Sequence, residues 1–172
     1  MKRKKELFRE LFPATMSLIL IVMQIALGII FLSDIEQNTV LAYIGVGLYV
    51  FPGWIFGMLP IFEFRRNGGV KKGKSYVHTT KLVDTGIYSI VRHPQYITWM
   101  CWAVAGMFLF QHWSILILGI PVILLTYVDL IDADEDGIKK FGEQYKQYMR
   151  TVPRANVVLG IIRRLQRNRR TI

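Results

Sequence analysis

The stretch Gly86-Ile-Tyr88-Ser-Ile-Val-Arg92-His93-Pro94-Gln-Tyr96 is polar and lies between two strongly apolar regions of the sequence. A charge-free run of 34 residues, Gln95 to Val128, overlaps its end. Pro94 suits the first position of a helix, where its missing N–H group costs nothing. The free N–H groups of that first turn, next to Arg92, would form an anion site. We therefore expect this stretch to form one wall of a cofactor site at a membrane surface.

The composition indicates a membrane protein. Of the 172 residues, 52% are hydrophobic, and the mean hydropathy of +0.32 is too high for an ordinary soluble domain of this size. The net charge is +10, but the charges are concentrated in polar segments. A basic soluble RNA-binding module would not contain long charge-free runs, so no nucleic-acid partner is expected. The single cysteine, Cys101, excludes a disulfide within the chain.

Four apolar segments predict an all-α, polytopic fold with one integral-membrane domain over residues 1–172. A helix needs about 20 apolar residues to cross the roughly 30 Å hydrocarbon core. The polar break Gln111-His112-Trp113 divides the 34-residue run into a helical hairpin. The predicted spans are residues 12–33, 39–62, 94–110 and 114–131.

The positions of the basic residues predict the orientation. Residues 1–13 contain five Lys or Arg, residues 63–96 contain seven and residues 132–172 contain ten, which accounts for all 22. The two turns on the opposite side contain none. By the positive-inside rule, both termini and the central connection are cytoplasmic in a cell or inner membrane.

Two cytosolic segments, residues 75–96 and 132–155, are predicted to form the site. After the acidic stretch Asp132–Asp136, apolar residues recur at helical spacing, and we expect one amphipathic helix from Asp134 to Arg154. The apolar stripe consists of Ile138, Phe141, Tyr145, Tyr148 and Val152. The basic tail, residues 156–172, has two open interpretations, a segment lying on an anionic membrane surface or a disordered end.

The residue types on this face suit a small molecule with both cationic and carboxylate ends. Carboxylates and tyrosine rings attract a sulfonium or ammonium group, and arginine with helix-start N–H groups binds a carboxylate. Only His78 and His93 are predicted to share this face, and no H-E-x-x-H or C-x-x-C spacing occurs, so no metal is expected. No P-loop or G-x-G-x-x-G pattern occurs either.

Three linked motifs carry a resemblance to a known family. They read Lys81-Leu-Val-Asp-Thr-Gly86-Ile-Tyr88, Arg92-His93-Pro94-Gln-Tyr96 and Phe141-Gly142-Glu-Gln-Tyr145-Lys-Gln-Tyr148-Met-Arg-Thr-Val-Pro153-Arg154. In order and spacing, over roughly residues 75–155, they resemble the isoprenylcysteine carboxyl methyltransferase and phospholipid methyltransferase family. The three motifs together are far more specific than Arg-His-Pro alone.

The resemblance implies an integral-membrane enzyme that uses S-adenosyl-L-methionine and a lipid or prenylated substrate entering from the bilayer. The favoured methyl acceptor is the carboxylate of an isoprenylated cysteine, which needs alignment but no base. Carried over by position, the catalytic residues are Arg150, Arg154 and Glu135. The cofactor contacts implied by the resemblance are Tyr88, Arg92, His93, Pro94, Tyr96, Asp134, Tyr145 and Tyr148.

The sequence departs from the family pattern in one place. Family members carry two glutamates seven and eight residues before the Phe of Phe-Gly, where this chain has Asp134 and Ala133, and an arginine four residues earlier, where it has Asp129. Asp132, Asp134 and Glu135 are the carboxylates available to substitute. Two alternatives stay open. One is methylation of a phospholipid headgroup amine, which needs a base such as Glu135 or His93, and the other is an inactive membrane scaffold of the same fold.

Overall fold

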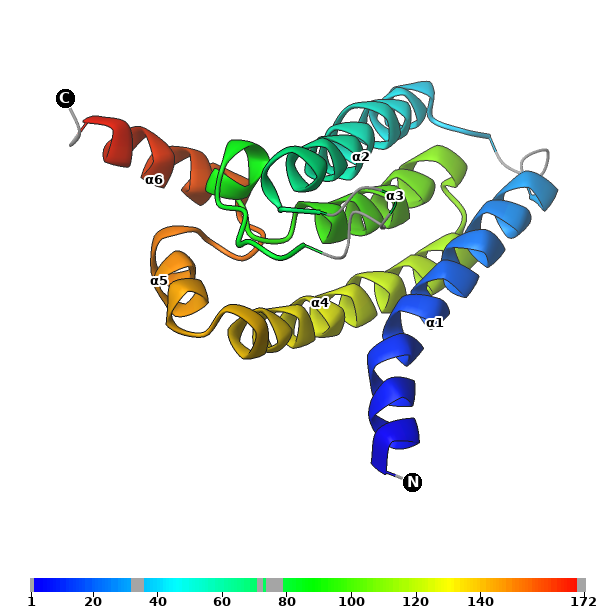
Figure 1. Cartoon of the computed structure of the whole chain (residues 1–172). Helices are drawn as coiled ribbons and strands as arrows, with labels where there is room; N and C mark the ends of the chain where they lie inside the picture. The colour runs from blue at the N-terminus through cyan, green and yellow to red at the C-terminus, as the bar shows by residue number, and fades with distance from the viewer. Residues whose placement is uncertain (1, 32–35, 71–72, 74–78, 170–172) are drawn as a thin grey trace. The chain divides into compact units, whose positions relative to one another are not determined.

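The computed structural model describes residues 2–31, 36–70, 73 and 79–169, and these residues form helices and connections without a strand (Figure 1). The prediction of an all-α fold is therefore confirmed. The elements in this part of the chain are α1 (Lys2–Ile30), α2 (Thr39–Asn67), the 3-10 turn η1 (Gly86–Ser89), α3 (Pro94–Phe110), α4 (Trp113–Phe141), α5 (Glu143–Thr151) and α6 (Val157–Arg169).

The long helices are apolar on their exposed surfaces. By length and composition, α2 and α4, at 29 residues each, could cross a membrane, while α1 contains the shorter apolar stretch Thr15–Ile30. Ile29, Phe51 and Leu124 expose 63%, 68% and 63% of their surfaces, respectively. Apolar surface on this scale is unfavourable in water and suits contact with lipid. These helices support a membrane protein, while the four spans and their orientation stay predictions.

The helices extend beyond the predicted spans, and one predicted helix is wrong. The span predicted to end at residue 131 continues as α4 through the acidic stretch to Phe141. The single amphipathic helix predicted from Asp134 to Arg154 is instead the end of α4 followed by α5, because Gly142 adopts φ 58° and ψ −130°, a conformation that helical residues cannot take. Helix α1 begins at Lys2, before the predicted span 12–33, and α2 ends at Asn67, after the predicted span 39–62, with Arg65 and Arg66 in a last turn whose dipole favours cations.

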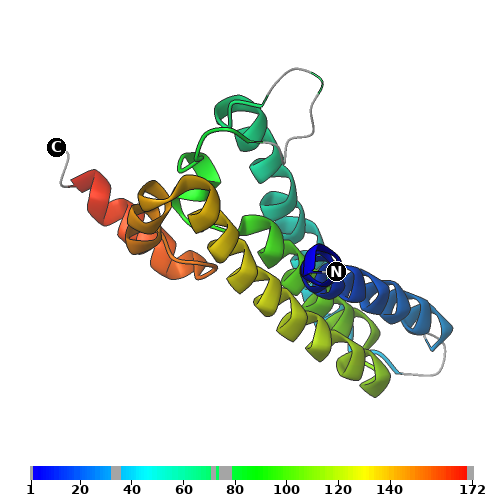
Figure 2. The same ribbon diagram turned by 60° about the horizontal axis from the view of Figure 1, so that its bottom comes forward.

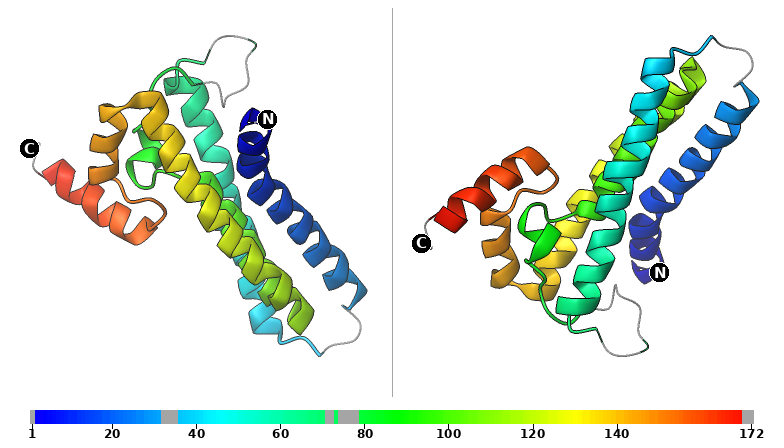
Figure 3. Two further views of the ribbon diagram at one scale, coloured as in Figure 1. Left: turned by 90° about the horizontal axis from the view of Figure 1, so that it is seen from below. Right: turned by 90° about the horizontal axis from the view of Figure 1, so that it is seen from above.

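The chain divides into two compact units. One contains Met1–Trp54 and Tyr96–Asp132, and the other contains Ile55–Gln95 and Ala133–Ile172. We call them the hairpin unit and the site unit. In the hairpin unit, α3 and α4 lie side by side, as Figure 2 and Figure 3 show, and Gly119 of α4 leaves room for Met107 of α3, whose methyl group would lie 2.3 Å from an added Cβ. The predicted helical hairpin is thus present.

A buried glutamine joins three helices of the hairpin unit. Gln24 of α1 is 1% exposed, and its Nε2 donates hydrogen bonds to Ala103 O of α3 at 3.0 Å and Ile115 O of α4 at 3.2 Å. An unpaired amide in an apolar interior would be costly, so both bonds favour this one arrangement of α1 against the hairpin. Ile21 and Val122 pack in the same core.

Candidate functional site

The site unit is organised around the buried carboxylate of Asp134, near the polar end of α4. Its side chain is 4% exposed. Arg92 donates two parallel hydrogen bonds to it, from Nη2 to Oδ2 at 2.6 Å and from Nε to Oδ1 at 3.0 Å. This fork-to-fork geometry is the strongest pairing available between an arginine and a carboxylate. It connects the Arg-His-Pro motif to the residue that occupies a family glutamate position.

Three further side chains bind the same carboxylate. The Nε2 atom of His93 lies 2.7 Å from Oδ1, Tyr145 OH donates to Oδ1 at 3.0 Å, and Arg154 Nε donates to Oδ2 at 2.7 Å. Asp134, Arg92, His93, Tyr145 and Arg154 together form what we call the Asp134 cluster. All five were predicted as site residues, and the structure brings residues from three separate segments onto one anion.

Backbone hydrogen bonds explain why these segments meet. The N–H groups of Arg92 and His93 donate to the carbonyls of Pro153 and Arg154 at 3.1 and 3.2 Å. The Nη1 atom of Arg92 also donates to Met149 O and Val152 O, at 3.1 and 2.6 Å. The last carbonyls of a helix have no partner within that helix, and a cation there is favoured by its dipole. Arg92 therefore holds the C-terminal end of α5 against the Arg-His-Pro motif.

The cluster fixes the protonation states of its members. Burial raises the pKa of Asp134, but the hydrogen bonds from His93, Arg92 and Arg154 outweigh burial and hold the pKa of this carboxyl well below its usual range. Burial and the neighbouring Asp134 charge raise the pKa of Tyr145 above that of a free phenol. At neutral pH Asp134 is an anion and Tyr145 a neutral donor, so Asp134 organises its neighbours and is no general acid.

A second tyrosine docks α5 onto the η1 turn. Tyr148 OH donates to Tyr88 O at 2.6 Å, and both residues are buried. The ring of Tyr88 stacks on Phe64 with a centroid distance of 4.6 Å, while Tyr148 meets Tyr145 edge to face at 5.7 Å. Burial and the neighbouring Tyr145 raise the pKa of Tyr148, so its hydroxyl stays protonated. Tyr88, Tyr145 and Tyr148 thus form the packed wall between α5, η1 and the end of α2.

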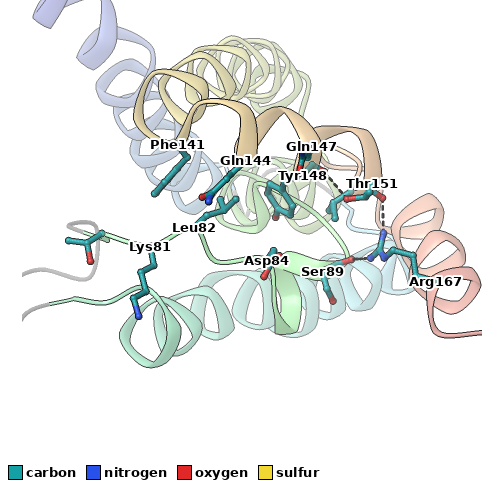
Figure 4. Close-up of a pocket in the computed structure, with 12 residues that line it drawn as sticks. Lys81, Leu82, Asp84, Ser89, Phe141, Gln144, Gln147, Tyr148, Thr151 and Arg167 are labelled. Carbon is teal, nitrogen blue, oxygen red and sulfur yellow. Dashed lines mark hydrogen bonds between the residues drawn. The ribbon is translucent and has the colours of Figure 1, made fainter. Parts of the chain in front are cut away.

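Tyr148 also lines a pocket of about 670 Å³, which lies between the segment 80–89, the end of α4, α5 and one side chain of α6 (Figure 4). Binding pockets for small molecules commonly measure about 300–1,000 Å³. We call it the α5 pocket. Its lining residues are Thr80, Lys81, Leu82, Asp84, Ser89, Phe141, Gln144, Gln147, Tyr148, Thr151, Val152 and Arg167.

The α5 pocket combines apolar walls with groups of both charges. Leu82 and Phe141 supply apolar surface, and Asp84 is the carboxylate among the lining residues. Arg167 reaches in from α6, where its Nη1 donates to Thr151 O at 2.7 Å and its Nη2 to Ser89 O at 2.6 Å. Such a pocket can hold a ring between apolar walls and a zwitterionic group between an acid and a base.

The other predicted residues belong neither to the Asp134 cluster nor to the lining of the α5 pocket. Glu135 is exposed on α4, and Arg150 is exposed on α5, where it lines a smaller cavity of about 170 Å³ with Arg163 and Gln166 of α6. Pro94 is buried at the start of α3. Tyr96 belongs to the hairpin unit. The roles predicted for these residues stay predictions.

Sequence reasoning missed several residues of the α5 pocket. Lys81 and Asp84 stand in the first motif, and Gln144 and Gln147 stand in the third, but none of them was assigned a role. The spacing of the buried tyrosines could have identified the two glutamines, because each stands one position before a tyrosine, on the neighbouring face of α5. No motif includes Arg167, so its position depends on tertiary structure alone.

Comparison with known proteins agrees with the motifs. A family model described as the isoprenylcysteine carboxyl methyltransferase family matches residues 72–140. Protein-S-isoprenylcysteine O-methyltransferase B of Arabidopsis thaliana is 30% identical over 134 residues, which cover 67% of this chain and 68% of that protein. None of the solved structures matches the chain.

Two longer relatives match a similar part of the chain. The protein-S-isoprenylcysteine O-methyltransferases of Homo sapiens and Schizosaccharomyces pombe are 30% and 26% identical over 130 and 132 residues. Each alignment covers 72% of this chain but only 44% of the human and 50% of the yeast protein, so the chain spans about half the length of these relatives. The family match, the plant relative and the three motifs in register agree, and the chain belongs to the isoprenylcysteine carboxyl methyltransferase family.

Proposed function

We propose that the chain is a membrane methyltransferase that uses S-adenosyl-L-methionine to methylate the carboxylate of an isoprenylated cysteine on a lipid-like substrate. The relatives' names state this activity for those proteins. The observation that carries the proposal here is the Asp134 cluster. In it one carboxylate joins the Arg-His-Pro motif to helix α5, which lines the α5 pocket.

The residues of the α5 pocket fit the chemistry of this cofactor. Asp84 would take its ammonium group, and Arg167 would take its carboxylate. Leu82 and Phe141 would flank the adenine ring. When bound, the cofactor supplies a methyl group on a positively charged sulfur, and an acceptor oxygen displaces the sulfur from that methyl carbon.

The Asp134 cluster would position the wall of that pocket. It holds α5 in place through Tyr145 and Arg92, and Tyr148 of the same helix lines the pocket. A wall fixed by buried hydrogen bonds needs no rearrangement when the ligand binds, which favours alignment of the reacting groups. The substitution of a family glutamate by Asp134 therefore leaves an engaged carboxylate, and this supports an enzyme over an inactive scaffold.

The same contacts favour a carboxylate acceptor over a phospholipid amine. A carboxylate attacks without losing a proton, whereas an ammonium headgroup must first lose one to a base. His93, one of the two predicted bases, directs Nε2 at Asp134 and lies 3.3 Å from Tyr145 OH, so this nitrogen is engaged. Glu135, the other, is exposed on α4.

Cofactor binding tests the proposal at its first step. Wild-type protein reconstituted in nanodiscs should bind S-adenosyl-L-methionine in a calorimetric titration. Asp84→Asn should weaken binding about 10- to 100-fold, because a charge-assisted hydrogen bond contributes about 1.5–3 kcal/mol. Asp136→Asn, an exposed acid outside the α5 pocket, serves as the matched control and should bind like wild type. Lack of binding by the wild type would contradict the proposal.

Methyl transfer tests the second step. With radiolabelled cofactor, the methyl group should appear as a base-labile ester on a farnesylated cysteine mimic. Label on phosphatidylethanolamine instead would support the amine alternative. Cofactor binding with transfer to neither acceptor would contradict the proposed substrate.

A further inference from the structure

The C-terminal helix α6 turns its apolar face away from the site unit. Val158, Ile161, Ile162 and Leu165 follow the i, i+3, i+4, i+7 pattern of one helix face. They are 69%, 44%, 47% and 57% exposed, respectively. In a soluble protein this face would point to the core, so its exposure calls for a partner.

A different face of α6 packs against the protein. Gly160 is buried, and a Cβ there would lie 2.0 Å from Ile90 O, so only glycine allows this close approach. Seven residues on, Arg167 donates to the carbonyls of Ser89 and Thr151. Residues three and seven apart lie on one side of a helix, so these contacts fix which way the apolar face points.

The charge of α6 identifies the chemistry of the partner. Residues 156–172 contain five arginines and no acidic residue. Arg164 and Arg169 are exposed; Arg164 borders the apolar face, and Arg169 follows it one turn after Leu165. A second copy of the chain would bring these like charges together, which disfavours self-association. An anionic surface with an apolar interior matches both properties.

The length of α6 excludes a helix that crosses the membrane and favours one that lies in the membrane plane. Its 13 residues extend about 20 Å, less than the roughly 30 Å of a bilayer core. An amphipathic helix of this kind lies in the plane of the membrane, with its apolar face between lipid headgroups. Helices α2 and α4 of the same chain are long and apolar enough to cross a membrane.

We propose that α6 is an interfacial helix that docks on an anionic phospholipid surface through Val158, Ile161, Ile162 and Leu165, with Arg164 and Arg169 contacting headgroups. Because Arg167 on the same helix lines the α5 pocket, docking places the pocket at the lipid surface. This inference does not depend on methyl transfer.

Site-directed fluorescence tests the docking in the full chain. Cys101 is the only cysteine, so Cys101→Ser gives a background without thiols. An environment-sensitive probe is attached at Ile162→Cys, or at Arg163→Cys, which is half-buried and lines the smaller cavity between α5 and α6. In nanodiscs of phosphatidylcholine and phosphatidylglycerol, nitroxide-labelled lipids should quench the probe at position 162 several times more than at position 163. Equal quenching at the two positions would overturn the proposal.

Charge variants identify the lipid chemistry. Each arginine near an anionic surface strengthens membrane binding about fivefold. The double variant Arg164→Gln, Arg169→Gln should therefore lower the equilibrium constant for docking of α6 about 25-fold. Lys139→Gln with Lys146→Gln removes the same charge from exposed sites outside α6 and should have no effect. Circular dichroism checks that each variant stays folded. Quenching of the probe at position 162 that is unchanged in pure phosphatidylcholine would overturn the proposal. A probe at position 162 that is protected from water only when each nanodisc holds more than one chain would also overturn it, in favour of a second copy as the partner.

Discussion

Replacing Asp134 with asparagine keeps the size of the side chain but removes the charge that three basic side chains share. Arg92 is 8% exposed and would be left as a buried, uncompensated cation. Breaking a buried ion pair at one partner destabilises a protein by about 3–5 kcal/mol, and retained hydrogen bonds to the amide favour the lower end. Thermal unfolding of the detergent-purified protein measures this loss. Asp136→Asn, where the side chain is 55% exposed, should change stability by less than about 0.5 kcal/mol.

In the wild type, acid should remove the stabilisation that the Asp134 charge provides. The pKa of Asp134 is lower in the folded protein than the ordinary value of about 3.9 in an unfolded chain. Its stabilisation is therefore complete above about pH 4 and is lost as pH falls toward the folded pKa, by up to about 1.4 kcal/mol per pH unit. The groups that face it are Arg92, His93, Tyr145 and Arg154. Unfolding curves of wild type and Asp134→Asn should converge below pH 4. A difference in stability between wild type and Asp134→Asn that stays constant below pH 4 would contradict the assignment of a lowered pKa to Asp134.

The sequence predicted the members of the Asp134 cluster but not their geometry. Arg92, His93, Tyr145 and Arg154 stood in motifs whose residue types suit an anion or a zwitterion, and these residues do meet. No pattern indicated that Asp134 would be their shared partner, because the choice among Asp132, Asp134 and Glu135 depends on the rotation of α4. Glu135 follows Asp134 by one position on a helix and is exposed instead.

At the scale of elements, the apolar runs located the helices, but the break between α4 and α5 was missed. A single glycine within an amphipathic pattern is ordinarily tolerated. Gly142 ends α4 because Tyr145 and Tyr148 must reach Asp134 and Tyr88 O, and a continuous helix does not provide the direction that α5 takes. These contacts are between residues distant in sequence, so local patterns do not encode them.

Gly142→Ala should therefore be destabilising by about 1–3 kcal/mol, since its φ of 58° and ψ of −130° suit glycine almost alone. Nothing lies within 4 Å of an added Cβ, so backbone strain is the whole cause. Gly47→Ala in α2 is the matched control, because that glycine is helical and its Cβ position is also open. It should be neutral or stabilising by up to about 1 kcal/mol. Equal thermal shifts in the two variants would show that the Gly142 conformation is not needed.

At the scale of the whole molecule, the two units differ in what stabilises them. The hairpin unit has a small core around Ile21, Ala103 and Val122, with large apolar side chains outside it. The site unit combines the buried polar contacts around Asp134 with an apolar cluster of Tyr145, Tyr148 and Val152. Lipid provides no hydrophobic driving force between helices, so packing and hydrogen bonds such as those of Gln24 must hold the spans together.

The distribution of basic residues predicts the topology, and α2 offers the sharpest test. Its 29 residues extend about 43 Å, enough to cross a bilayer. The positive-inside rule places Arg66, at its end, in the cytoplasm and Glu36, before its start, on the opposite side. In the Cys101→Ser background, a membrane-impermeant maleimide should label Glu36→Cys in intact cells, and Arg66→Cys only after the membrane is permeabilised. Both positions are exposed, so neither is protected by packing. Labelling of both in intact cells would mean that α2 does not span, and the reverse pattern would put the Asp134 cluster on the opposite side of the membrane from the one predicted.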